Sequence, residues 1–535
     1  MDAKVDPGSP PIMSWFSLPG RPFRAATYAG FALFILGMAV ATANIHPFDS
    51  DAVANLVAVR SIVPDGTLYL PAHSNAIKTP IYLLAHVLFG YSSDAIVFAD
   101  IASTAGFFAL AFACVMVWTR GSPRPHTVAI PLAYLACLSP HFIWLFVNPG
   151  NRNLDIGLSL AWLAIILTSR LRRGCALLSI ALTALLVIND PWFVTTFALP
   201  AAAVLFLVAA NSTSAAPVRS RWAPPVILAL GVALGFALRS SINATGIVKF
   251  AGSETDYMVV AADRLGFNIG LAMDALLRYF NAWVFGQPLL GEETLKGMAN
   301  LAVVSLGIAG LISGARAADE RLRKISLWGL IALAISMLLY VFTSAAVDAS
   351  TARYLIIAPI MTSIGLAIGL TQWRNRGLRL QLGILGLIGA CLVANLFAVS
   401  DAIGQWRTPN RFESQQIVLD ALKTSGMRDG YSDYWNGLSY TYHSADAVRI
   451  RALICDGQRV IPFNWLSQSR WYAPDPERRP TFMLLTFPEQ ATLAKCGRAG
   501  LLNQFGASRS MFIDKGNTHI AEILIWDYDI AARLP

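Results

Sequence analysis

Apolar segments of membrane-spanning length recur along the chain and constrain its fold more than any other feature. A helix needs about 20 mostly apolar residues to cross a bilayer. Eleven such segments lie near residues 25–45, 94–118, 127–147, 153–169, 174–189, 191–209, 222–240, 298–315, 325–345, 354–371 and 378–400. Only 14% of the residues are charged, whereas soluble proteins average about 25%. The sequence therefore predicts an α-helical polytopic membrane protein with about eleven transmembrane helices.

A short polar interruption separates the predicted segments 174–189 and 191–209. The apolar stretch 174–209 is continuous in hydropathy except at Asn189-Asp190-Pro191. A polar pair followed by proline favours a tight turn over one very long helix. We therefore expect two helices here.

Basic residues gather in alternate loops, and this pattern predicts the orientation of the chain. The basic connections contain Arg21 and Arg24, Arg120 and Arg124, Arg170, Arg172 and Arg173, Arg219 and Arg221, Arg316, Arg321, Arg323 and Lys324, and Arg374, Arg376 and Arg379. Cytoplasmic loops carry an excess of lysine and arginine. The N-terminus is thus predicted to be cytoplasmic and the C-terminus extracytoplasmic. The net charge of +9 follows from these loops, so it does not indicate a nucleic-acid partner.

The predicted topology divides the chain into two domains. Residues 1–400 form a transmembrane domain whose longer loops, 46–93 and 241–297, lie on the extracytoplasmic face together with residues 401–535. The last of these segments, here named the tail, is more polar and reads as a small α/β domain. Its expected strands are Arg459–Phe463, Thr481–Thr486 and Ile520–Trp526.

Cys455 and Cys496 are the only cysteines of the tail. Disulfides form and persist in oxidising compartments. A bridge between these two cysteines and a pair of free buried thiols are equally compatible with the sequence.

Three stretches of the outer loops are apolar but unsuited to cross a membrane. Residues 52–63 and 81–90 are too short to span, and residues 267–290 have apolar side chains at helical spacing. Such segments are typical of helices that lie in the membrane interface. We expect interfacial helices at all three places.

Two carboxylates at the end of the first apolar segment are candidates for chemistry. Asp49 and Asp51 belong to the motif His46-Pro47-Phe48-Asp49-Ser50-Asp51. A carboxylate at a helix mouth can lose water, and its pKa then rises toward that of a useful general base. Asp51 could instead cap the following helix, because Asp is a favoured N-cap.

Two further outer loops contain arginines, against the topological preference. Arg152 could neutralise Asp155, cap a helix end or grip a phosphate, for which the guanidinium geometry is well suited. Arg353 and Tyr354 precede a late apolar segment. This pair could anchor the helix at the interface or bind an anionic partner.

These features together resemble the GT-C glycosyltransferases. The resemblance rests on the acidic motif after the first helix, interfacial helices in the first outer loop, the element Thr79-Pro80-Ile81-Tyr82, short-looped helices, the outer Arg353-Tyr354 pair and the extracytoplasmic tail. It is closest to bacterial members similar to protein mannosyltransferases and to the aminoarabinose transferase of lipid A. The family often has an acidic pair with Glu here, whereas this chain has Asp-Ser-Asp.

The resemblance implies an inverting sugar transfer from a polyprenyl-phosphate donor to a glycan, lipid or protein acceptor. The reaction would take place at the outer face of a bacterial cytoplasmic (inner) membrane, in contact with membrane lipids. Asp49 or Asp51 would be the base, and Arg353, with Lys78 or Arg152, would hold the phosphate.

The chemistry of cofactors is only partly constrained by the sequence. It contains no Walker A loop, which argues against nucleotide-driven transport. No spacing of His and Cys suggests a zinc site. The sequence leaves open whether a divalent ion helps to hold the phosphate. The rival functions are a lipid-linked saccharide flippase or exporter and a surface-polysaccharide polymerase or ligase.

Overall fold

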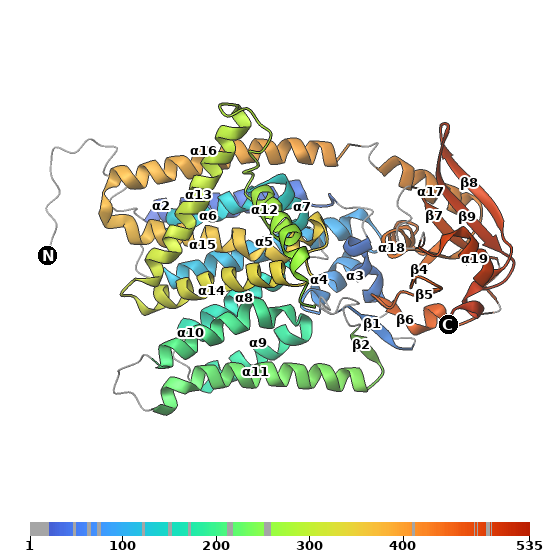
Figure 1. Cartoon of the computed structure of the whole chain (residues 1–535), viewed down its shortest axis with the longest axis horizontal. Coiled ribbons are helices and arrows are strands. Elements are labelled where there is room, and N and C mark those ends of the chain that lie inside the picture. The colour runs from blue at the N-terminus through green and yellow to red at the C-terminus, as the bar shows by residue number, and fades with distance from the viewer. Residues whose placement is uncertain are drawn as a thin grey trace.

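The structure, a computed structural model, describes most of the 535-residue chain. The described residues are 21–45, 50–60, 66–71, 76–119, 124–147, 152–168, 173–210, 218–250, 258–408, 412–475, 477–478, 480–487, 493 and 495–535. Within them, long helices pack side by side, and a sheet made by the tail stands at one end of the helical bundle (Figure 1).

Each apolar segment predicted from the sequence folds as helix. Among the described residues, six helices are individually long and apolar enough to span a membrane: α2 (Arg21–Thr42), α5 (Ser93–Trp118), α11 (Val218–Ala244), α13 (Glu292–Ala315), α14 (Glu320–Phe342) and α16 (Leu378–Trp406). The prediction of a polytopic helical membrane protein is therefore confirmed.

Two further candidate spans are helix pairs with a bend. The helices α6 (His126–Ala136) and α7 (Pro140–Val147) meet at 89°, and η3 (Ala349–Leu355) meets α15 (Ile357–Gln372) at 42°. Proline lacks the backbone N–H that a helix interior needs, so Pro140 starts a new helix instead of continuing α6. Counting each pair as one span gives up to eight spans in the described residues.

The remaining apolar helices are shorter than a straight span. They are α8 (Asn153–Thr168), α9 (Arg173–Asn189) and α10 (Leu199–Ala210), the last preceded by the π-helical turn η1 (Val194–Ala198). At 1.5 Å per residue, a helix of 16 residues falls short of a hydrocarbon core of about 30 Å. The turn expected at Asn189-Asp190-Pro191 separates α9 from the next helix, as predicted. The total of eleven crossings and the cytoplasmic N-terminus stay predictions.

Small residues let two helices of the bundle approach closely. A Cβ atom added to Gly365 on α15 would overlap the carbonyl oxygen of Gly307 on α13, and one added to Gly310 would overlap the carbonyl oxygen of Gly365. Close backbone approach through small residues is a common way for membrane helices to associate. The contact between α13 and α15 therefore depends on these glycines.

A set of buried amide side chains links α13 to α6 and α16, and to the turn that follows α12. Asn300 on α13 accepts a hydrogen bond from Tyr134 on α6 at 2.9 Å and donates to Asn395 on α16 at 3.2 Å. Asn281, after α12, donates to the same Asn395 oxygen at 2.9 Å. Hydrogen bonding within the set removes much of the cost of burying amides, so these groups serve packing.

Helices of the outer loops lie where interfacial helices were expected. They are α3 (Ser50–Arg60), α4 (Thr79–Phe89) and, after the turn η2 (Ala262–Arg264), α12 (Leu265–Tyr279). The last is shorter than the predicted stretch 267–290. It ends before Asn281, whose φ of 50° lies in the left-handed region, and the chain then continues in turns to Gly291.

A small sheet joins both outer loops to the tail. The strand β1 (Leu68–Leu70) of the first loop pairs in parallel with β2 (Val248–Phe250) of the second loop, and antiparallel with β6 (Ser467–Gln468) of the tail. Strand pairing requires all three segments to lie on the same side of the membrane. The structure thus brings together the three segments that the charge pattern assigns to one face.

The tail contains a mixed six-stranded sheet. Its order is β5-β4-β3-β7-β9-β8, built from β3 (Asp429–Ser432), β4 (Arg449–Cys455), β5 (Val460–Pro462), β7 (Thr481–Thr486), β8 (Arg509–Lys515) and β9 (Thr518–Trp526). The helical elements of the tail are α17 (Glu413–Thr424), α18 (Tyr434–His443), η6 (Ser469–Tyr472), α19 (Gly497–Phe505) and η7 (Ile530–Arg533). The three strands predicted from the sequence are confirmed.

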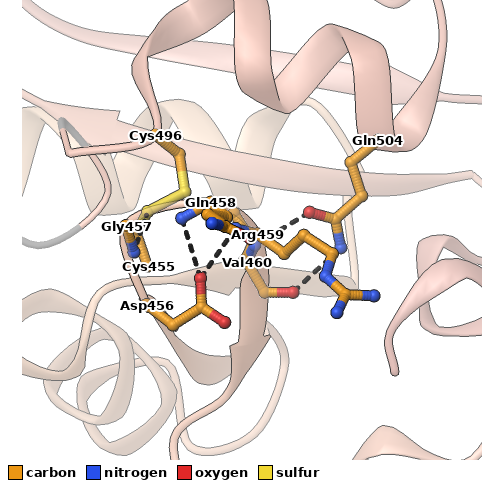
Figure 2. Close-up of a disulfide and its surroundings, with 8 residues drawn as sticks. All are labelled: Cys455, Asp456, Gly457, Gln458, Arg459, Val460, Cys496 and Gln504. Carbon is orange, nitrogen blue, oxygen red and sulfur yellow. Dashed lines mark hydrogen bonds between the residues drawn. A yellow bond between two sulfur atoms is a disulfide. The ribbon is translucent and has the colours of Figure 1, made fainter.

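Cys455 and Cys496 form a disulfide with their Cα atoms 5.8 Å apart (Figure 2). The bridge ties the end of β4 to the residue before α19. Of the two alternatives left open by the sequence, the structure has the bridge.

Replacing Gly365 with alanine should destabilise the bundle. The new methyl group would overlap the Gly307 carbonyl oxygen, and overpacking of this kind costs about 1–3 kcal/mol. The thermal unfolding midpoint of the purified protein in detergent should fall. Gly386→Ala on α16 is the matched control, because nothing lies within 4 Å of its added Cβ. An unchanged midpoint for Gly365→Ala would contradict the prediction, because it would mean that α13 and α15 accommodate the methyl group without loss of stability.

Candidate functional site

Charged and polar side chains gather where the membrane helices meet the tail. The helices α3 and α18 lie side by side at this junction (Figure 1). Of the residues singled out from the sequence, the structure places Asp51, Lys78, Arg152, Asp155, Arg353 and Tyr354 in one connected group. Asp49 lies outside the described residues.

Asp51 is held by a residue of the tail. It is the second residue of α3, in the first turn, so the N-terminal end of the helix favours its charge. The Tyr434 hydroxyl donates a hydrogen bond to its Oδ1 at 2.6 Å. Burial raises the pKa of the Asp51 carboxyl, while the bond from Tyr434 and the charge of Arg353 oppose this rise.

Lys78 is fully buried at the N-cap position of α4. Its backbone is fixed because Pro80 lies in the first turn of α4, where proline is tolerated, and because Ile77 N–H donates to Asn189 Oδ1 at 3.0 Å. Burial lowers the pKa of the Lys78 ammonium to about 8. The carboxylates of Asp155 and Asp100 limit that fall, so the amine lies close to its titration point at neutral pH.

Asp100 and Asp155 are the buried carboxylates that face Lys78. Asp100 on α5 accepts the Asn44 backbone N–H at 2.7 Å, and Asp155 is in the first turn of α8. Among the described residues, no hydrogen bond of normal geometry reaches either oxygen of Asp155. Asp100 was not singled out from the sequence, although an ionisable residue inside a predicted span marks a functional site by default.

Arg152 forms an ion pair with Asp190, which is 38 residues away in the chain. Its guanidinium carbon lies 5.0 Å from the Trp192 ring centroid and 5.8 Å from that of Tyr354. The direct partner of Arg152 is thus Asp190 and not Asp155, the acidic partner considered from the sequence. A pocket beside this pair is lined by Arg152, Asp155, Ile156, Ser159, Leu186, Asn189, Asp190, Trp192, Phe193 and Phe197.

Arg353 also lies beside the Tyr354 ring. Its guanidinium carbon is 5.6 Å from that ring centroid, and its charge acts on Asp51. The turn η3 that carries it is capped by Asp348, which accepts the Ser350 N–H at 2.8 Å. The Tyr354 ring therefore has the guanidinium carbons of both Arg152 and Arg353 beside it, at 5.8 Å and 5.6 Å from its centroid.

The site as a whole combines a half-buried carboxylate with nearby cations. Tyr434 was missed by sequence reasoning, because its contact with Asp51 joins residues 383 positions apart. Within the described part of the chain, no group of three or more His, Cys, Asp or Glu side chains could hold a metal ion. The arrangement can accept a proton at Asp51 and attract an anion at Lys78 and Arg353.

Comparison with known proteins identifies a solved structure with a similar fold. No family model and no curated protein matches the sequence. A solved structure of ArnT from Cupriavidus metallidurans, bound to undecaprenyl phosphate, matches with a TM-score of 0.53 and 9% sequence identity, over 95% of this chain and 98% of ArnT. The chain has a GT-C-like fold. The resemblance predicted from the sequence is confirmed at this level, across nearly the whole of both chains.

Proposed function

We propose that this protein is an inverting glycosyltransferase that moves a sugar from a polyprenyl-phosphate donor to an acceptor hydroxyl. The observation that carries the proposal is that the charge of Arg353 acts on the Asp51 carboxyl, in a fold shared with ArnT. The buried Lys78 is linked to this pair indirectly, through Arg152 and Tyr354. The ArnT structure is bound to undecaprenyl phosphate, which is a carrier of the class proposed here.

Asp51 acts as the general base. It takes the proton of the acceptor hydroxyl while the acceptor oxygen attacks the anomeric carbon of the donor. The bond from that carbon to the phosphate oxygen breaks, and the polyprenyl phosphate leaves with the electron pair. A raised pKa brings a carboxyl closer to the working pH and makes it a stronger base.

Lys78 and Arg353 hold the phosphate. Cations placed where negative charge develops stabilise the departing group, and they do so best in a water-excluded site. Arg152 is already paired with Asp190, so its role is to fix the wall of the site together with Trp192 and Tyr354. Binding of an anion would in turn keep Lys78 protonated.

The active site faces the extracytoplasmic side. The sheet of β1, β2 and β6 requires both outer loops and the tail to share one side, and the alternation of basic loops favours the outer one. The Cys455–Cys496 disulfide supports the same side, because disulfides persist in oxidising compartments. The protein would then act at the outer face of a bacterial inner membrane.

Replacing Asp51 with asparagine should lower turnover by about 10²–10⁴-fold, the usual contribution of a general base. The assay gives the purified protein a series of polyprenyl-phosphate sugars with extracted membrane lipids as acceptors, and measures released polyprenyl phosphate. Asp94→Asn is the control, since Asp94 is an exposed residue in the first turn of α5. Asp49→Asn is measured in parallel to decide between the two carboxylates of the motif.

Full turnover in both Asp49→Asn and Asp51→Asn, with each variant folded, would remove the general-base assignment. Movement of the lipid across a vesicle membrane without release of polyprenyl phosphate would instead identify a flippase.

The affinity for undecaprenyl phosphate should fall as the pH rises through about 8, the pKa of Lys78. Below this pH the ammonium is charged and attracts the phosphate, and above it the free protein holds a neutral amine. Between pH 7.5 and 9.5 the dissociation constant should rise by up to about tenfold per pH unit. Lys78→Met should bind weakly with no such pH dependence, whereas Lys296→Met, which removes a partly exposed lysine paired with Glu292, should match the wild type. A flat wild-type profile would exclude Lys78 from the phosphate site.

Cysteine labelling should report the proposed orientation. Thr424→Cys, at the exposed end of α17, should react with a membrane-impermeant maleimide in intact spheroplasts. Ala318→Cys, exposed between α13 and α14 in a predicted cytoplasmic loop, should react only after lysis. Both variants are made with Cys175→Ser, since Cys175 is the one described free cysteine that is not buried. The opposite labelling pattern would reverse the assigned sides.

A further inference from the structure

The tail sheet has a topological switch point at the carboxyl end of β3. The strands β4 and β7 lie on either side of β3, and both run parallel to it. In open α/β sheets, ligands bind in the crevice outside the carboxyl ends of the strands at such a point. Here the chain leaves β3 at Ser432 and enters α18 directly.

This end of the sheet lies against the membrane domain. The Ser50 hydroxyl donates to the Trp435 carbonyl oxygen at 2.9 Å, and the Tyr434 hydroxyl donates to Asp51 Oδ1 at 2.6 Å. Both contacts link the first turn of α3 to the first turn of α18. The place where a free α/β domain would bind a ligand is therefore filled by the helix that carries the proposed base.

The local structure holds Tyr434 in one position. Asp433 caps α18 by accepting the Asn436 backbone N–H at 3.1 Å, which fixes the turn around Tyr434. The Tyr434 ring is 6% exposed, with the rings of Trp435 and Phe463 each 5.2 Å away. A side chain confined in this way delivers its hydroxyl to Asp51 at little further entropic cost.

The other end of α18 docks on the membrane domain without touching the base. The Tyr442 hydroxyl donates to the Ser92 carbonyl oxygen at 2.8 Å, and the Tyr91 hydroxyl donates to Asp446 at 3.2 Å. Tyr434 and Tyr442 are thus two buried tyrosines, eight residues apart, on one helix. Each donates a hydrogen bond to the membrane domain, but only Tyr434 reaches a carboxylate.

We infer that Tyr434 is a positioning residue for Asp51, so that docking of the tail completes the active site of the proposed transferase. The inference rests on the proposed function. The hydroxyl fixes the plane of the carboxylate and favours its charged form. A hydrogen bond to an ionised group contributes more than one between neutral groups. Among the described residues, Arg353 from η3 and Tyr82 from α4 also act on Asp51 or are acted on by its charge.

The test is Tyr434→Phe, compared with Tyr442→Phe. Turnover falls as the pH drops through the pKa of Asp51, because the protonated carboxyl cannot accept the hydroxyl proton. Losing the Tyr434 bond removes a stabiliser of the charged form and raises this pKa, so the acid limb of the profile should move to higher pH. Turnover at neutral pH should fall roughly tenfold or more, and the KM for the donor should stay unchanged.

The Tyr442→Phe variant separates positioning from docking. It removes a hydrogen bond of the same helix to a backbone carbonyl, so its acid limb should match that of the wild type. If Tyr434→Phe and Tyr442→Phe lower turnover equally and neither moves the acid limb, Tyr434 serves only to dock the tail and the inference is wrong.

Infrared titration gives a readout that does not depend on turnover. The difference between wild-type and Asp51→Asn spectra reports protonation of this carboxyl, and the same difference in the Tyr434→Phe background should show a higher pKa. An unchanged value would overturn the inference even where Asp51→Asn abolishes transfer. If Asp51→Asn keeps full turnover while Tyr434→Phe still raises the carboxyl pKa, the contact stands and the proposed function fails.

Discussion

The compensation of buried charge is the constraint on which the site depends. Taking an ion out of water costs several kcal/mol even after the protein relaxes, and Lys78 is fully buried. The carboxylates of Asp100 and Asp155 compensate the charge of its ammonium. Close by, Arg152 and Asp190 neutralise each other in an ion pair. These groups come from α5, α8, the turns before α4 and α8 and the turn after α9. The outer ends of several helices are therefore held in one arrangement by the need to keep opposite charges together.

The same constraint bears on how the site would bind the proposed phosphate-bearing lipid. Asp155 is buried. The charge of Lys78 favours its ionised form most, and Arg152 and the Asn189 side chain add to this effect, whereas the nearby Asp190 opposes it. Lys78 in turn is close to losing its proton. An arriving anion would shift this balance toward a fully charged lysine, and the polar end of a lipid would be bound where the membrane helices meet water. In such a site the charged groups would already be in place before the ligand binds.

The sequence predicted the elements of the fold better than their contacts. The lengths of the apolar segments identified the described helices of the bundle, with α6 and α7 taken as one. Runs of residues that favour strands identified β5, β7 and β9, because these signals are local. The break between α6 and α7 was missed, although the Ser139-Pro140 step is a local signal for it. Arg152 shows the limit of sequence proximity. Asp155 is its nearest acidic residue in the sequence, yet the ion pair is with Asp190. Tyr434 carried no signal, since nothing near it in the chain shows that α18 packs on α3.

The contacts that the sequence did not show are those that join the tail to the bundle. Strand pairing among β1, β2 and β6 uses backbone groups, so it needs no particular side chains and leaves no motif. The hydroxyl of Tyr434 adds one specific side-chain contact to this general attachment. A reaction centre built on α3 alone would leave Asp51 in the first turn of a short helix, open to water and free to rotate. With the tail attached, the carboxylate is half-buried and held from the tail side. Under the proposed function the tail is thus a wall of the active site, and both parts of the chain contribute to one reaction.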